Sequence, residues 1–255
     1  MAHSVLHNLV FEFNDNSLTI ITVKKNQFIV DFRFFEALDN EKLETILAEL
    51  PEIYSEITLL IRNKNFIILP ESFYNEDVNE IFKLSYTLPE NETVWVDKSE
   101  QNMGIAYAIN TGLIQLIIAK FPRVKIHHEA TVIISKLYKE VNFKHPRILI
   151  TINNESLIIF AINEGDLLLC NSYSVSSNDD IFYFVMLAVE QLHFIPSEME
   201  LVILGEPPAR NEIFELFKNY INEINIWMEE YQTDHQIITT ESLSHSFALQ
   251  TLVCE

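Results

Sequence analysis

The chain has 255 residues, 48% of them hydrophobic, and a formal net charge of −20 at pH 7. This length allows one large domain or two modest ones, and the apolar content, with 18 Phe, excludes a disordered chain. The acidic balance argues against nucleic-acid binding, because Lys and Arg must neutralise phosphates there.

The cysteines and the hydropathy bound the cellular setting. The two cysteines, Cys170 and Cys254, do not make a disulfide framework. The N-terminal stretch MAHSVLHNLV lacks the basic region and apolar core of a signal peptide, and no apolar run reaches the roughly 20 residues that span a bilayer. We therefore expect a cytoplasmic protein without membrane insertion.

The first part of the chain predicts three short strands, a helix and a fourth strand. The turn formers Asn14, Asp15 and Asn16 separate the first two strands. From Leu43 to Leu50, apolar residues recur at the i, i+3, i+4, i+7 spacing of one helical face, after a start near Asp39. The strands are predicted from period-two or continuous apolar runs at 9–13, 18–23, 28–32 and 56–62.

The second part repeats this order. Asn-x-x-Ser-Leu stands at the same place in both copies, at 14–18 and at 153–157. Ser177 and Asp180 resemble a capping box at the start of a helix. Strands are predicted at 147–152, 157–162, 167–173 and 199–205, and a last helix at 209–224.

Three segments of the first half have no simple counterpart in this order. Residues 64–108 are predicted to be an insertion with a short helix near 76–84 and two strands. The last helix of the first copy is delayed to about 110–121, and a further helix is expected at 129–140. The predicted lobes are therefore residues 1–141, with the insertion, and residues 147–255.

Duplicated βββαβα units are typical of an α/β, actin-like or ribonuclease-H-like fold with two lobes, each a mixed sheet flanked by helices. The stretch LLLCNSYSVSSNDDIFYFVMLAVEQLHFIPSEMELVILGE and the segment NFIILPESFYNED resemble a Bacteroidetes-type domain family of unknown function, classed with actin-like ATPases. The resemblance implies a fold similar to actin homologues of cell division and pilus assembly, and no particular activity. The matching positions are Asn171, Tyr173, Asp180, Tyr183, Glu190, Gln191, Leu192, Leu204 and Gly205.

Active actin-like enzymes carry glycine-rich phosphate turns, because backbone amides must approach the anion closely. This chain has four glycines, and neither first hairpin contains one. Gly205, at a possible adenosine loop, is followed by Glu206 and two prolines. We therefore expect no catalytic residues, no metal ligands and no cofactor. Any vestigial cleft turns would be formed by Asp15, Asn16, Asn153, Asn154 and Gly205.

Two functions remain open at this point. The first is a non-catalytic actin-like protein that acts through an unknown protein partner, as an interaction or assembly factor. The alternative is a divergent nucleotide-binding ATPase or kinase relative that uses the cleft between the lobes with ATP and Mg²⁺. The sequence leaves the oligomeric state undetermined.

Other clusters have simpler interpretations. His127, His128 and Glu129 could form part of a metal site, but adjacent histidines on a strand point to opposite faces, which favours a structural role. Asp179 and Asp180 fall in the first turn of a helix, where acids favour the helix dipole. The aromatic stripe that continues to Trp227, Met228 and Tyr231 is either core or a docking surface.

Overall fold

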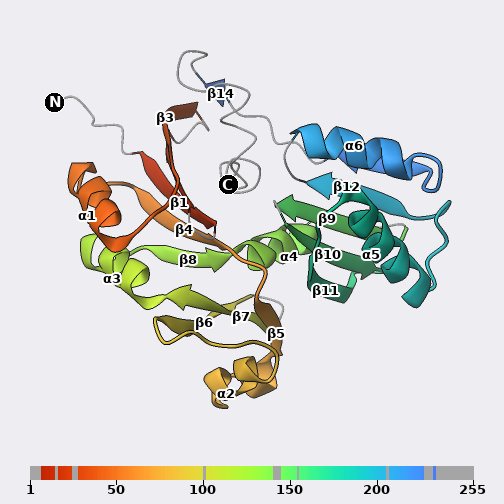
Figure 1. Ribbon diagram of the computed structural model, residues 1–255, viewed down its shortest axis with the longest axis horizontal. Helices are drawn as coiled ribbons and strands as arrows, with labels where there is room; N and C mark the ends of the chain where they lie inside the picture. Colours follow the sequence, from red (N-terminus) through yellow and green to blue (C-terminus); the bar gives the residue numbers. More distant parts are fainter. Residues whose placement is uncertain are drawn as a thin grey trace. The chain divides into compact units, whose positions relative to one another are not determined.

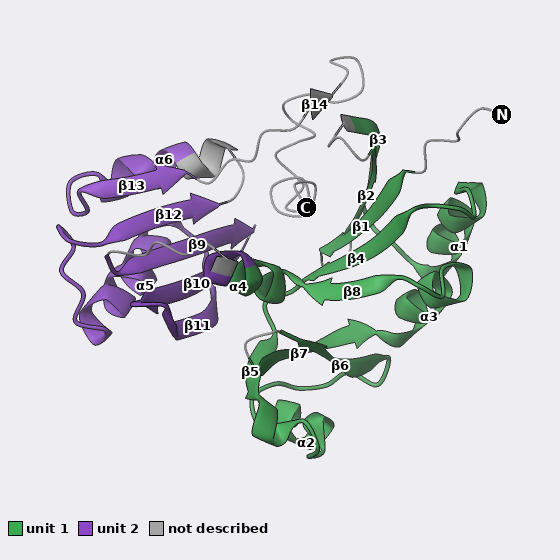
Figure 2. Ribbon diagram, turned by 180° about the vertical axis from the view of Figure 1, so that it is seen from behind, with its two compact units in different colours: residues 1–135, 229–255 green, residues 136–228 purple. Residues whose placement is uncertain are grey.

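The computed structural model describes residues 7–14, 17–24, 28–99, 102–139, 145–153, 155–204, 207–226 and 232–233. The chain divides into two compact units, residues 1–135 with 229–255, and residues 136–228 (Figure 2). Each unit contains its own mixed sheet (Figure 1). None of the helices in the described part of the chain is long and apolar enough to cross a bilayer.

The main sheet of the first unit has the strand order β14-β3-β2-β1-β4-β8. β1 pairs antiparallel with β2 and parallel with β4, so it lies inside the sheet, and its residues are almost all buried. The four strands predicted for this half are confirmed. The strands are β1 (Asn8–Asn14), β2 (Ser17–Val23), β3 (Phe28–Phe35), β4 (Glu56–Arg62), β8 (Lys125–His128) and β14 (Gln232–Thr233).

β14 pairs in parallel with β3. This part of the chain therefore joins the sheet of the first unit, whereas the sequence interpretation placed all of 147–255 in the second lobe. A strand of two residues carries no periodicity that the sequence pattern could show.

Side-chain caps begin helices of the first unit, among them the two that follow β3 and β7 (Met103–Asn110). Asp39 accepts a hydrogen bond from the Lys42 backbone N–H at 2.8 Å, and Asn110 accepts one from the Leu113 N–H at 3.1 Å. Both caps satisfy a donor that the helix itself leaves unpaired. Asp39 caps α1 (Asn40–Glu49) and Asn110 caps α3 (Thr111–Lys120). The helix that follows β8 is α4 (Glu129–Lys139).

Gly112 lets the start of α3 approach the start of α1. A Cβ atom at this position would lie 2.7 Å from the Asn40 side-chain amide, closer than real Cβ contacts. The two helices pack against each other, and α1 buries Leu43 and Ile46, as its apolar spacing predicts.

The predicted insertion forms a separate antiparallel sheet with the order β5-β7-β6. The expected helix and two strands are confirmed, and β5 is an additional strand. Trp95 on β6 lies opposite Tyr107 on β7, and Tyr107 also pairs with Phe66 on β5. The elements are β5 (Phe66–Pro70), the 3₁₀ turn η1 (Glu71–Phe73), α2 (Val78–Lys83), β6 (Glu92–Lys98) and β7 (Met103–Asn110).

The sheet of the second unit has the order β11-β10-β9-β12-β13. It matches the order β3-β2-β1-β4-β8 of the first unit, and in both sheets the first strand has an antiparallel neighbour on one side and a parallel one on the other. The repeat seen in the sequence is thus a repeat of topology. The strands are β9 (Arg147–Asn153), β10 (Ser156–Asn163), β11 (Asp166–Ser174), β12 (Glu200–Leu204) and β13 (Glu223–Ile226).

Two helices, α5 (Asn178–Gln191) and α6 (Pro207–Phe217), pack on this sheet. The capping box is confirmed, because the Asp180 N–H donates to Ser177 Oγ at 3.2 Å and the Ser177 N–H donates to Asp180 at 3.0 Å. The prediction of a helix over 209–224 is wrong at its end. Residues 223–226 pair in parallel with β12, and this strand pairing overrides the helical spacing.

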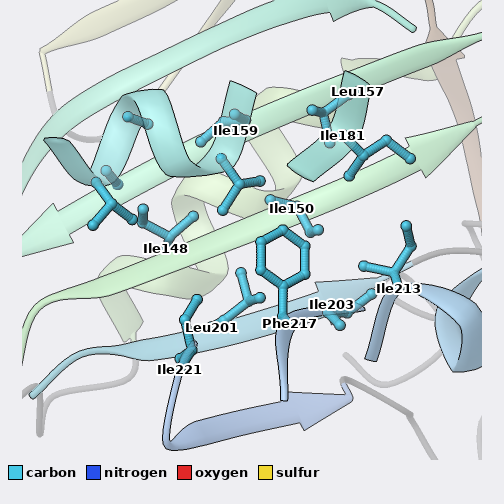
Figure 3. Close-up of a cluster of buried hydrophobic side chains, with 14 of the residues drawn as sticks. Ile148, Ile150, Leu157, Ile159, Ile181, Leu201, Ile203, Ile213, Phe217 and Ile221 are labelled. Carbon is cyan, nitrogen blue, oxygen red and sulfur yellow. The ribbon is translucent and has the colours of Figure 1, made fainter. Parts of the chain in front are cut away.

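The core of the second unit lies between its sheet and these helices (Figure 3). Ile148 and Ile150 of β9 are fully buried beneath Phe217 of α6, and Ile181 of α5 is 4% exposed. Each such side chain contributes about 1.5–3 kcal/mol of hydrophobic stabilisation. This core fixes α5 and α6 on the sheet.

Candidate functional site

The carboxyl ends of three parallel strands lie at one edge of the first unit's sheet. Asn14, the last residue of β1, is opposite Arg62, the last residue of β4. Ile61 is opposite His128, which ends β8. In α/β sheets this edge is where ligands usually bind, so its side chains define the candidate site.

Arg62 is buried there between two carboxylates. Its Nη1 donates to Glu12 at 3.1 Å and its Nε donates to Glu129 at 3.0 Å. The side chains of Arg62, Glu12 and Glu129 are only 7%, 1% and 2% exposed. Glu12 comes from the middle of β1 and Glu129 from the first residue of α4, so the cluster joins three parts of the chain.

The two carboxylates set the electrostatics of this cluster. Burial alone would lower the pKa of the Arg62 guanidinium, but the charges of Glu129 and Glu12 and their hydrogen bonds raise it above its ordinary value. One cation and two anions give a formal charge of −1. The positive charge at this edge is therefore neutralised by the protein's own carboxylates.

His128 is a neutral structural residue beside this cluster. Its Nδ1 accepts a hydrogen bond from the Ala130 N–H at 3.1 Å, so the proton is on Nε2, which lies 3.2 Å from the Asn63 carbonyl oxygen. Burial lowers the pKa of His128 to about 4. The ring also packs against Phe66 and Tyr107, with centroids 4.9 Å apart in both cases.

The sequence His127-His128-Glu129 does not converge on one point. The His127 ring lies 3.2 Å from an Asp97 carboxylate oxygen, His128 contacts Asn63, and Glu129 binds Arg62. Within the described ranges, no three His, Cys, Asp or Glu side chains lie close enough together to hold a metal ion.

The described residues that flank the two first turns are paired in the same way. Ser17 is paired with Asn14 and donates its hydroxyl to the Asn14 carbonyl at 3.0 Å. Ser156 is paired with Asn153 and makes the same bond at 2.9 Å. Asn14 and Asn153 are the last residues of β1 and β9, so the first strand of each unit ends in a residue with an amide side chain.

Most of the cleft-turn residues expected from the sequence fall outside the part of the chain that the structure describes. These are Asp15, Asn16, Asn154 and Gly205, so only Asn153 can be placed. The sequence interpretation missed Glu12 and Arg62, and it considered Glu129 only as part of a possible metal site. A signal was present for Glu12, because it is a charged residue inside an otherwise apolar stretch of β1.

A cavity of about 120 Å³ lies in the first unit beside Arg62. Its walls are mainly apolar, with Phe13, Ile61 and Leu113, and its polar lining includes Arg62 and Glu92. Burial raises the pKa of Glu92. The volume is close to the roughly 150 Å³ that accommodates benzene and below the roughly 300 Å³ of ordinary ligand pockets, so only a small group fits.

Residues 4–224 match the family described as a protein of unknown function, DUF3822. The chain belongs to the DUF3822 family. No curated protein matches this DUF3822 protein.

The solved structures similar to this DUF3822 protein include one with an actin-like ATPase fold. A Bacteroides thetaiotaomicron protein with an actin-like ATPase fold and unknown function is 16% identical, with a TM-score of 0.73 over 95% of this chain and 97% of the other. The PilM–PilN type IV pilus biogenesis complex is 11% identical, with a TM-score of 0.52 over 98% and 96%. The predicted actin-like fold and the predicted resemblance are confirmed.

Proposed function

We propose that this DUF3822 protein is a non-catalytic actin-like protein that acts in the cytoplasm by binding another protein, as an interaction or assembly factor. The observation that carries the proposal is the amide at both first-strand ends. Asn14 and Asn153 occupy equivalent places in the two units. The backbone carbonyl of each accepts a hydrogen bond from the hydroxyl of the serine three residues later.

The described residues fit a nucleotide and Mg²⁺ poorly. Mg²⁺ in nucleotide sites is held through one or two carboxylates together with the phosphates, and a neutral amide supplies less charge. The carboxylates of Glu12 and Glu129 at the edge of the first sheet are bonded to Arg62. Arg62 is in turn neutralised by them, so it is poorly suited to bind phosphate. We therefore derive no catalytic step for this site.

The fold itself is compatible with a role in protein assembly. The similar PilM structure is a complex with PilN, a protein–protein assembly of type IV pilus biogenesis. An acidic chain of net charge −20 disfavours nucleic acid as the partner and leaves a protein as the better candidate.

Phosphate release and thermal unfolding with ATP, ADP or GTP in the presence of Mg²⁺ test this proposal. We expect release at the buffer rate and no rise in the unfolding temperature, because a ligand stabilises only a native state that binds it. Asn14→Ala and Asn153→Ala are the matched variants. Turnover by the wild type that both variants lose would refute the proposal and support a divergent nucleotide-hydrolysing relative.

A further inference from the structure

Helix α5 carries an exposed aromatic side chain on the side opposite to the core. Tyr183 is 59% exposed, and Leu187, one helical turn later, is only half-buried. A helix that covers a sheet normally turns a polar face to solvent. The residues of α5 that face the core are Ile181, Val185, Ala188 and Val189.

Aromatic rings extend this apolar surface to both flanks of α5. Tyr183 contacts Phe184 with centroids 5.2 Å apart, and Phe184 stacks on Tyr173 of β11 at 4.4 Å. On the other flank, Phe182 contacts Tyr220 at 4.9 Å, and Tyr220 is 54% exposed. Consecutive helical residues point about 100° apart, which places the three rings of 182–184 across the helix. We call these five residues the aromatic band.

The surroundings of the aromatic band are acidic. The chain has no Lys or Arg between Arg147 and Arg210, a stretch that includes all of β11 and α5. Asp179 and Glu190 lie on α5 itself and are exposed. Lys218, close in sequence to Tyr220, is paired with Glu215. The band therefore combines two exposed tyrosine rings, Tyr183 and Tyr220, supported by three partly buried rings, with negative charge.

We propose that the aromatic band docks a basic protein segment in which Arg or Lys alternates with apolar residues. Exposed tyrosine rings attract guanidinium and ammonium groups, whose aliphatic stems also cover apolar surface. Negative charge around the band steers a cationic partner toward it and repels an acidic one. The inference rests on the proposed protein-binding function and names the chemistry of the partner.

Charge disfavours the other occupants. A second copy of this chain would bring the same acidic surface and a net charge of −20 to the contact. Nucleic acids and anionic lipid surfaces carry the same sign and would be repelled. A basic segment of another protein is the occupant that the charge and the rings both favour.

A fluorescein-labelled peptide of alternating Arg and Leu, added to the full chain at physiological salt, tests the surface by fluorescence anisotropy. We expect saturable binding that weakens at least about 10-fold in Tyr183→Ala and in Tyr220→Ala, as for tyrosines that act as binding hot spots. Tyr183→Phe should retain binding because it keeps the ring. Leu84→Ala, directly after α2, is the matched control, since Leu84 is 86% exposed and lies in the other unit.

Three outcomes would overturn the proposal. The first is that Tyr183→Ala and Tyr220→Ala bind the Arg-Leu peptide with wild-type affinity and unfold at the wild-type temperature. Another is equal binding of a peptide with Glu in place of Arg. The third is a dimer of the chain that dissociates in Tyr183→Ala, because it would assign the surface to a second copy. None of these outcomes bears on nucleotide turnover, so failure here leaves the proposed function standing.

Discussion

The buried neutral His128 makes the first unit sensitive to acid. Its pKa is lowered to about 4 by burial, against 6.5 for an exposed histidine. Between these two values the unfolded chain binds a proton that the folded chain does not, so the free energy of unfolding falls as the pH falls. The contribution of neutral His128 is fully present above pH 6.5 and is lost as the pH approaches 4.

The size of this effect follows from the two pKa values. A difference of about 2.5 pH units, at about 1.36 kcal/mol each, gives a loss of about 3 kcal/mol between pH 7 and pH 4. His128→Gln removes the titrating group and can still donate to the Asn63 carbonyl. The difference in unfolding free energy between wild type and His128→Gln should therefore shrink by about 3 kcal/mol over this range.

Urea unfolding followed by the fluorescence of Trp95 measures this difference. Trp95 lies opposite Tyr107, which packs on His128, and a Trp227→Phe background leaves it as the only tryptophan. His145→Gln, which replaces an exposed histidine, is the control. Parallel curves for wild type and His128→Gln from pH 7 to pH 4 would refute the assignment of His128 as buried and neutral.

Three further substitutions test the packing at single sites, with urea unfolding as the measurement. Arg62→Met leaves Glu12 and Glu129 buried without their guanidinium and should cost about 3–5 kcal/mol; an effect below about 1 kcal/mol would contradict the buried cluster. Tyr107→Phe should be neutral or stabilising by about 1 kcal/mol, because no described residue pairs with the buried Tyr107 hydroxyl; a clear loss of stability would show a hidden partner. Ser177→Ala should lower stability by about 1 kcal/mol through loss of the α5 cap, and an unchanged value would contradict the capping box.

The sequence was sufficient for the strands and helices whose burial repeats along the chain. β1, β2 and β4 are largely apolar, and the apolar residues of α1 recur at the spacing of its buried face. β8 has four residues and β14 has two, too few for a period to be recognised. β13 was hidden because Ile224 also continues the helical spacing after Ile221, and only the pairing with the neighbouring β12 decides between helix and strand.

The candidate site was less accessible from the sequence because it joins distant residues. Arg62 is 50 positions from Glu12 and 67 from Glu129, and no local pattern links them. The absence of glycine from the first hairpins was readable, and it motivated the non-catalytic interpretation. The strand register was needed to show that the first strand of each hairpin ends in an asparagine paired with the serine three residues later. The hydroxyl of that serine donates to the asparagine backbone carbonyl.

Calorimetric titration of ATP with Mg²⁺ into the wild-type chain tests the central claim most directly, because it detects binding with or without turnover. A protein without a nucleotide site should give no saturable heat at nucleotide concentrations up to the millimolar range. Saturable binding at micromolar concentration that weakens in Asn14→Ala or Asn153→Ala would contradict the central claim, because the strand ends would then form a working nucleotide site.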